Sequence, residues 1–152
     1  MARYISLYSG SSGNCSVVEE NGKFILIDMG KSARLTNKAL TQLGLDIKNL
    51  QGILVSHEHT DHTSGLGVLF KKTGVPIYGL KETVAYVLYK YPYISNINIL
   101  PPALKIGKLE IKSFATSHDV PSVGYTIECG NKKISIATDL GNVTDGVCDA
   151  LK

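Results

Sequence analysis

An apolar run leads directly into a cluster of polar side chains in the segment Ile53-Leu54-Val55-Ser56-His57-Glu58-His59-Thr60-Asp61-His62. The unbroken apolar start is typical of a strand that is covered on both faces. Three of the chain's four histidines follow it directly. Side chains two positions apart at a strand end point to the same side, so His57 and His59 can reach one ion together. Asp61 and His62 then lie in a loop or first helical turn, where they can face a second ion.

The chemistry of these side chains supports a metal site. Imidazole nitrogen and carboxylate oxygen are ligands that Zn²⁺ and Mn²⁺ accept. A polar turn is the alternative, but a turn has no need of a histidine triplet. We therefore predict that two divalent ions, Zn²⁺ or Mn²⁺, bind after this strand.

Two further polar residues are predicted to lie at strand exits. His118 follows an apolar strand pattern, and Asp139 ends another. Functional groups of layered α/β sheets collect at the edge where strands end. His118 is thus expected to complete the first ion site, and Asp139 to bridge the two ions. The alternatives are a hydrogen-bonded structural histidine and an aspartate that caps the following segment.

The rest of the chain has the periodicity of a mixed α/β fold. Helices are expected from the cap Ser32 to the stop at Gly44, with Leu35 and Leu40 inward, over 64–72, and over 82–91, with Val84, Val87 and Leu88 inward. Strands are predicted over 3–8, 15–18, 23–28, 52–56, 76–80, 97–100, 104–106, 109–114, 124–128 and 133–138. Strands and helices alternate in the middle of the chain, and strands predominate at its end.

Composition indicates one globular domain over residues 1–152. Of these residues 43% are hydrophobic, and the formal net charge is +3, too small to indicate a nucleic-acid partner by itself. No apolar run approaches the roughly 20 residues of a membrane span, and no signal peptide is apparent. Cys15, Cys129 and Cys148 have the spacing of reduced thiols. We expect a cytoplasmic protein without membrane contact.

The motifs together resemble a known family. His57-x-His59-x-Asp61-His62 after a hydrophobic strand, with Ile27-Asp28-Met29-Gly30 upstream and Thr138-Asp139-Leu140-Gly141 downstream, resembles the metallo-β-lactamase superfamily. The opening Tyr8-Ser9-Gly10-Ser11-Ser12-Gly13-Asn14 is similar to its YycJ/WalJ branch of bacterial hydrolases, which are DNA exonuclease-like. The resemblance implies an αββα sandwich. It also implies a metal-dependent hydrolase, a phosphodiesterase or nuclease such as a 5′–3′ DNA exonuclease, with DNA as its partner.

The resemblance also assigns the ligands. It gives His57, His59 and His118 to the first ion, and Asp61, His62 and bridging Asp139 to the second. A hydroxide held between the ions is the implied nucleophile, and Asp61 is the catalytic residue that orients it.

Two groups near the ligands have less direct roles. Asp28 is expected to orient the histidine loop through hydrogen bonds without touching metal. The loop of Ser11, Ser12, Gly13 and Asn14 is either a glycine-rich turn or the phosphate-binding side of the cleft.

The chain departs from the family pattern in one respect. Family members carry another histidine in a second half, and none follows His118 here. We therefore expect an amino-terminal portion, roughly the first αβ half, with an incomplete second ion site. One face of the first sheet is expected to lack its partner layer, so that the chain needs a missing half or self-association. The alternatives are a thioester hydrolase of the glyoxalase II type and a metal-binding fragment without turnover.

Overall fold

Two β-sheets form the centre of the protein in a computed structural model, which describes residues 2–116 and 119–137. The first sheet has the order β1 (Ala2–Tyr8), β2 (Cys15–Glu20), β3 (Lys23–Ile27), β4 (Leu50–Leu54), β5 (Ile77–Gly79) and β6 (Ile97–Ile99). The second has the order β10 (Lys132–Ile136), β9 (Ser122–Cys129), β8 (Leu109–Thr116) and β7 (Leu104–Ile106). Strands β1 to β3 pair antiparallel and β3 to β6 pair parallel, whereas the second sheet is antiparallel throughout.

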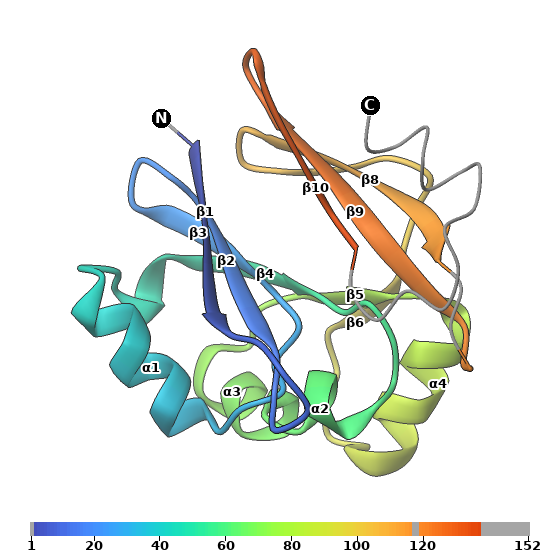
Figure 1. Cartoon of the computed structure of the whole chain (residues 1–152). Coiled ribbons are helices and arrows are strands. Elements are labelled where there is room, and N and C mark those ends of the chain that lie inside the picture. The colour runs from blue at the N-terminus through green and yellow to red at the C-terminus, as the bar shows by residue number, and fades with distance from the viewer. Residues whose placement is uncertain (1, 117–118, 138–152) are drawn as a thin grey trace.

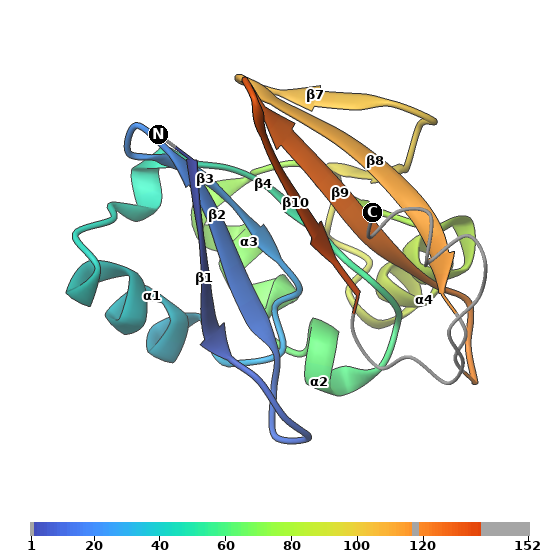
Figure 2. The same ribbon diagram turned by 45° about the horizontal axis from the view of Figure 1, so that its top comes forward.

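Helices lie on the face of the first sheet that is turned away from the second (Figure 1). They are α1 (Ala33–Gln42), the short α2 (Thr60–Thr63), α3 (Leu66–Thr73) and α4 (Lys81–Lys90), with a 3₁₀ turn at Ile47–Asn49. Figure 2 shows the second sheet stacked over the first, with the helices beyond. The described residues thus form three layers, helices, sheet and sheet.

Each layer contact has its own apolar core. On β3, Leu26 packs toward the helices, whereas Ile25 and Ile27 pack toward the second sheet. On β4, Ile53 packs toward the helices and Leu54 packs toward the second sheet. This explains the unbroken apolar run, because a strand covered on both faces needs apolar side chains at every position.

The mixed α/β fold and the order of its elements are confirmed. Ser32 caps α1, and its side chain accepts a hydrogen bond from the Leu35 N–H at 3.2 Å. Gly44 ends the helical segment at φ +78°, a conformation that glycine adopts without steric cost.

Two expected inward positions are wrong. Leu35 is 44% exposed, because α1 turns Ala33, Thr36 and Leu40 toward the sheet instead. Leu88 is 37% exposed, while its neighbour Val87 is buried. In both helices the buried stripe is narrower than the apolar pattern suggested.

The expectation of an uncovered first sheet is also wrong. Strands β7 to β10 form the second sheet, which packs on the face that was expected to be bare. Alternate side chains of β8 and β9 fill this contact, namely Leu109, Ile111, Val123, Tyr125 and Ile127. Within the described ranges, no helix is long and apolar enough to cross a membrane.

Candidate metal centre

The exit of β4 is held by hydrogen bonds on both sides. The Val55 N–H, just beyond the end of β4, donates to the carbonyl of Tyr78 in β5 at 2.9 Å. From the second sheet, the Tyr125 hydroxyl donates to the Val55 carbonyl at 2.7 Å, and the Val123 N–H donates to Ser56 at 2.9 Å. The histidine loop therefore starts from a backbone fixed by both sheets.

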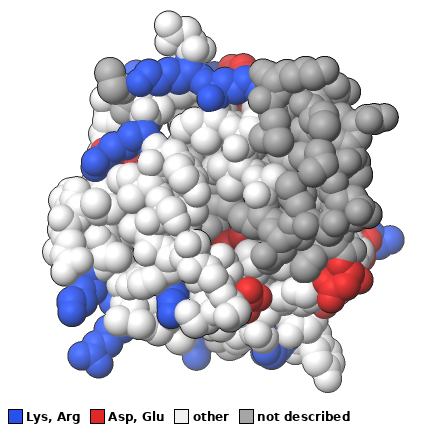
Figure 3. All heavy atoms as spheres, viewed as in Figure 1, with Lys and Arg blue, Asp and Glu red and all other residues white. Residues whose placement is uncertain are grey.

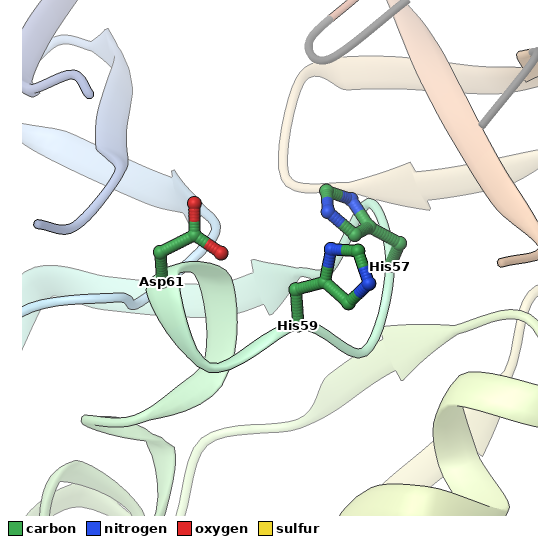
Figure 4. A group of neighbouring side chains, drawn as sticks. All are labelled: His57, His59 and Asp61. Carbon is green, nitrogen blue, oxygen red and sulfur yellow. The ribbon is translucent and has the colours of Figure 1, made fainter. Parts of the chain in front are cut away.

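Three of the predicted ligands come together directly after this exit. Ligand atoms of His57, His59 and Asp61 all lie within 4.8 Å of one another. Figure 4 shows the two imidazoles next to each other and the Asp61 carboxylate directed into the same space from α2. His59 is the N-cap residue of α2, so a single helical turn places Asp61 beside the loop.

His62, the next residue of α2, joins this group. Its ring is fully buried, with its centroid 4.0 Å from that of His57. His62 Nε2 lies 3.5 Å from Asp61 Oδ2. Bonds of 2.0 to 2.1 Å in a tetrahedral zinc site place two ligand atoms about 3.4 Å apart. The spacing and chemistry of this pair therefore fit a divalent ion.

Asp28 is buried behind His62. Its carboxylate lies 2.7 Å from His62 Nδ1, and it accepts hydrogen bonds from the Ser56 N–H at 2.7 Å and the Ser56 hydroxyl at 2.8 Å. A carboxylate at Nδ1 places the proton of the neutral imidazole there and leaves the lone pair on Nε2, which faces Asp61. Asp28 thus holds both His62 and Ser56 through hydrogen bonds, and its expected role as a residue that does not touch the metal stays a prediction.

The backbone at Asp28 is itself unusual. Asp28 has φ +65°, a left-handed conformation that is rare outside glycine and more accessible to Asp than to most residues. Such conformations persist where the surroundings hold them, and they cluster at functional sites. Here the turn directs the carboxylate inward, where both Ser56 donors reach it.

Gly30 permits the close approach of two loops. A Cβ atom at this position would lie 1.7 Å from the Asp61 carbonyl oxygen and 2.8 Å from the Asn14 nitrogen. No side chain fits there without moving backbone. The glycine of the Ile27-Asp28-Met29-Gly30 motif thus lets the segment after β3 lie directly against the ligand loop.

The loop between β1 and β2 contacts the ligands through Asn14. The Asn14 N–H donates to the Asp61 carbonyl at 2.7 Å. The Asn14 side-chain nitrogen lies 3.2 Å from Asp61 Oδ2 and 3.2 Å from His62 Nε2. Ser11 and Ser12 are exposed, Gly13 is buried, and Ser12 accepts a hydrogen bond from Lys31 Nζ at 3.4 Å. Of the four predicted loop residues, Asn14 contacts the ligands most directly.

Two predicted ligands, His118 and Asp139, lie outside the described residues. Asp119 was not predicted to lie at the site, and its Oδ2 is 3.5 Å from His59 Nε2. The contact of Asn14 with the ligands was also missed. No local pattern indicates either contact, because each joins residues that are far apart in the sequence.

Two other ionisable side chains near Asp28 are buried and stay neutral. Burial raises the pKa of the Cys15 thiol, and the charge of Asp28 adds to this rise. Burial likewise raises the pKa of the Tyr125 hydroxyl well above its ordinary value. A thiolate is the metal-binding form of cysteine, so Cys15 has a structural place beside the site.

Comparison with known proteins agrees with this geometry. The family model of the metallo-beta-lactamase superfamily matches residues 8–148. This chain belongs to the metallo-β-lactamase superfamily. Exodeoxyribonuclease YycJ of Bacillus anthracis is 34% identical over 151 residues, which cover 96% of this chain and 57% of that protein. Exodeoxyribonuclease WalJ of Streptococcus pneumoniae is 31% identical over 151 residues, covering 94% and 56%. The chain thus spans just over half the length of these curated relatives.

Other superfamily members share less of the sequence. Ribonuclease Z of Treponema pallidum is 31% identical over 129 residues, covering 74% of this chain and 41% of that protein. The metallo-beta-lactamase fold protein YhfI of Bacillus subtilis superposes with a TM-score of 0.71 at 17% identity, over 89% of this chain and 61% of that one. At this identity the likeness concerns the fold alone, and it confirms the metallo-β-lactamase-like fold.

Proposed function

We propose that this chain is the metal-binding part of a metal-dependent phosphodiesterase that acts on DNA, as a 5′–3′ exonuclease. The observation that carries the proposal is the convergence of His57, His59, Asp61 and His62 at one strand exit. The YycJ and WalJ relatives, both named exodeoxyribonucleases, support the choice of substrate.

Each ligand has a proposed role. His57 and His59 hold one Zn²⁺ or Mn²⁺ ion through ring nitrogens, and Asp61 and His62 hold a second. His118 and Asp139 remain predicted ligands of the same two ions. When bound, a divalent ion polarises a phosphoryl oxygen and lowers the pKa of a coordinated water.

The protein's own groups prepare this chemistry. The Asp61 carboxylate lies beside both imidazoles, where it can accept a hydrogen bond from the attacking water and orient it. Asp28 fixes the tautomer of His62 and leaves Nε2 as the nitrogen that binds. The contacts of Asp61 with the imidazoles and of Asp28 with His62 join protein groups only, so the ligand side chains need little rearrangement when an ion binds.

A basic surface next to the site supports a polyanionic substrate. Arg34 and Lys38 are exposed on α1, and Lys31 lies just before this helix. No Asp or Glu occurs between residues 29 and 45. Figure 3 shows blue side chains over α1 with no red among them. The Lys31 ammonium contacts Ser12, in the same loop as Asn14, so this surface adjoins the ligands.

Two other functions are compatible with the same ligand motif. A thioester hydrolase would use the same ligand motif, although such an enzyme has no evident use for the basic surface of α1. A fragment that binds metal without turnover is the other, because the chain spans 57% of its YycJ relative.

The test measures bound ions per chain and hydrolysis of end-labelled DNA and of a thioester, with Zn²⁺ or Mn²⁺. His59→Ala is expected to lose one ion. Asp61→Asn is expected to lose DNA cleavage, whereas Glu58→Gln, a control in the same loop, should keep both properties. Cleavage of the thioester alone would overturn the proposal. Full metal binding without cleavage of either substrate would favour the fragment alternative.

A further inference from the structure

We propose that Asn14 is a positioning residue that holds Asp61 and His62 ready for the second ion. The inference rests on the proposed two-ion site. It concerns the Ser9 to Asn14 loop, whose sequence suggested either a simple turn or a phosphate-binding side. The hydrogen bonds of Asn14 give this loop a third use.

Asn14 is attached to the ligand loop through both its backbone and its side chain. Its backbone N–H donates to the Asp61 carbonyl at 2.7 Å, and its own carbonyl accepts from the Gly30 N–H at 2.9 Å. The side-chain nitrogen lies 3.3 Å from the same Asp61 carbonyl. Asn14 therefore links the β1–β2 loop, the segment after β3 and the metal loop.

The orientation of the Asn14 amide is fixed by Gly10. The Gly10 N–H donates to Asn14 Oδ1 at 3.1 Å, and Asn14 Nδ2 donates to the Gly10 carbonyl at 2.9 Å. A flipped amide would place donor against donor and acceptor against acceptor, at the cost of both bonds. The side chain therefore presents N–H, and not oxygen, to Asp61 and His62.

An amide nitrogen has no lone pair for a cation, so Asn14 does not ligate. Its two hydrogens are divided as well. One serves the Gly10 carbonyl, and the other is shared between Asp61 oxygens and His62 Nε2. Because this second hydrogen is shared, it can leave His62 Nε2 when a cation takes that lone pair and still donate to Asp61.

The hydrogen bonds of Asn14 should affect the binding of the second ion and not that of the first. Asn14 holds the 3.5 Å separation of Asp61 Oδ2 and His62 Nε2, whereas no hydrogen bond among the described residues joins it to His57 or His59. Loss of a group that orients a metal ligand lowers metal affinity about 10- to 100-fold. Loss of Asn14 should therefore weaken the second ion and spare the first.

The experiment is a competition titration of the whole chain with Zn²⁺ against a chromophoric chelator, with thermal unfolding of the same samples. Asn14→Ala is expected to bind the weaker ion about 10- to 100-fold less tightly and the tighter ion as before. Ser12→Ala, in the same loop, should leave both affinities unchanged. Asn14→Asp, of equal size, should also hold Asp61 and His62 less well in place for the second ion. In the metal-free protein this should lower the midpoint of thermal unfolding, and Zn²⁺ should restore it.

The inference fails if Asn14→Ala binds both ions like the wild type. It also fails if both affinities fall together, which is the result expected of a merely structural residue. If Asn14→Ala does not fold, Asn14→Asp decides, and an unchanged midpoint there overturns the inference. A wild-type chain that binds only one ion overturns it as well. If wild type binds two ions with the expected Asn14 effect but leaves DNA intact, the proposed function fails and this inference stands.

Discussion

The carboxylate of Asp28 lies 2.7 Å from Nδ1 of His62, and both side chains are almost completely buried. The same carboxylate accepts two hydrogen bonds from Ser56, the last residue before the histidine cluster. One residue after β3 therefore fixes both the start of the ligand loop and the ring orientation of a ligand within it. This arrangement connects the geometry of the sheet to the chemistry of the site.

Replacing Asp28 by Asn should weaken metal binding and leave the fold intact. The amide is equally large but neutral, so it no longer favours the His62 tautomer whose Nε2 faces the site. We expect a 10- to 100-fold loss of affinity for the second ion, measured by chelator competition. Asp46→Asn, an exposed residue at the 3₁₀ turn, is the matched control. Equal affinities in the two variants would contradict the role of Asp28.

Gly30→Ala should destabilise the protein. The added methyl group would lie 1.7 Å from the Asp61 backbone oxygen, so the two loops would have to separate. Overpacking of this kind costs about 1–3 kcal/mol of unfolding free energy, occasionally more, and urea denaturation measures it. Gly52→Ala is the comparison, because its nearest contact is 3.3 Å away, at the end of the Ile106 side chain. Equal losses of unfolding free energy in the two variants would show that the contact between Gly30 and the Asp61 backbone leaves room for a methyl group.

The extent to which sequence predicts this structure depends on the range of the interaction. Local patterns predicted the β4 strand, the cap at Ser32 and the histidine cluster, because strand periodicity, capping and ligand spacing are written within a few residues. The positions of Leu35 and Leu88 were wrong, since the sheet contact, and not the helix alone, selects the buried stripe.

Long-range contacts lay beyond the sequence. The second sheet covers β3 and β4 through side chains some 60 to 100 positions later in the chain, and no local pattern says which face they meet. Asn14 approaches Asp61 across 47 positions. The approach depends on Gly30, and its motif predicts a role for the aspartate but not the need for a position without a side chain.

Alkaline pH should destabilise the fold through Cys15 and Tyr125. The folded-state pKa of each is raised by burial, whereas in the unfolded chain the ordinary values of 9.0 and 10.0 apply. Well below pH 9 both states keep these protons, and stability is unaffected. As pH rises further, the unfolded chain ionises first, so stability falls by up to about 1.4 kcal/mol per pH unit for each group. Urea unfolding at pH 8, 9, 10 and 11 measures this slope.

The Cys15→Ala variant isolates one of these groups. It should be less stable at pH 8, because a buried side chain is shortened, yet its stability should fall less steeply between pH 9 and 10. A slope equal to that of the wild type would exclude Cys15 as a source of the pH dependence.

The basic face of α1 gives a prediction that depends on salt. Each Lys or Arg that neutralises a phosphate contributes about 0.7 to 0.9 to the slope of log affinity against log salt concentration. Arg34→Gln with Lys38→Gln should therefore lower the slope for DNA by about 1.4 to 1.8. Metal content should not change, because neither side chain contacts a ligand in the described part of the chain.

The matched control removes the same charge elsewhere. Lys132 and Lys133 are exposed at the start of β10, at the end of the second sheet away from α2 (Figure 1). Replacing both by Gln alters net charge equally but leaves α1 intact, so the wild-type slope should remain. If the two double variants lower the salt slope of DNA affinity by the same amount, DNA binding depends on the overall charge of the protein. Only a loss confined to the α1 variant would place the phosphate backbone along this helix, because net charge is then excluded as the cause.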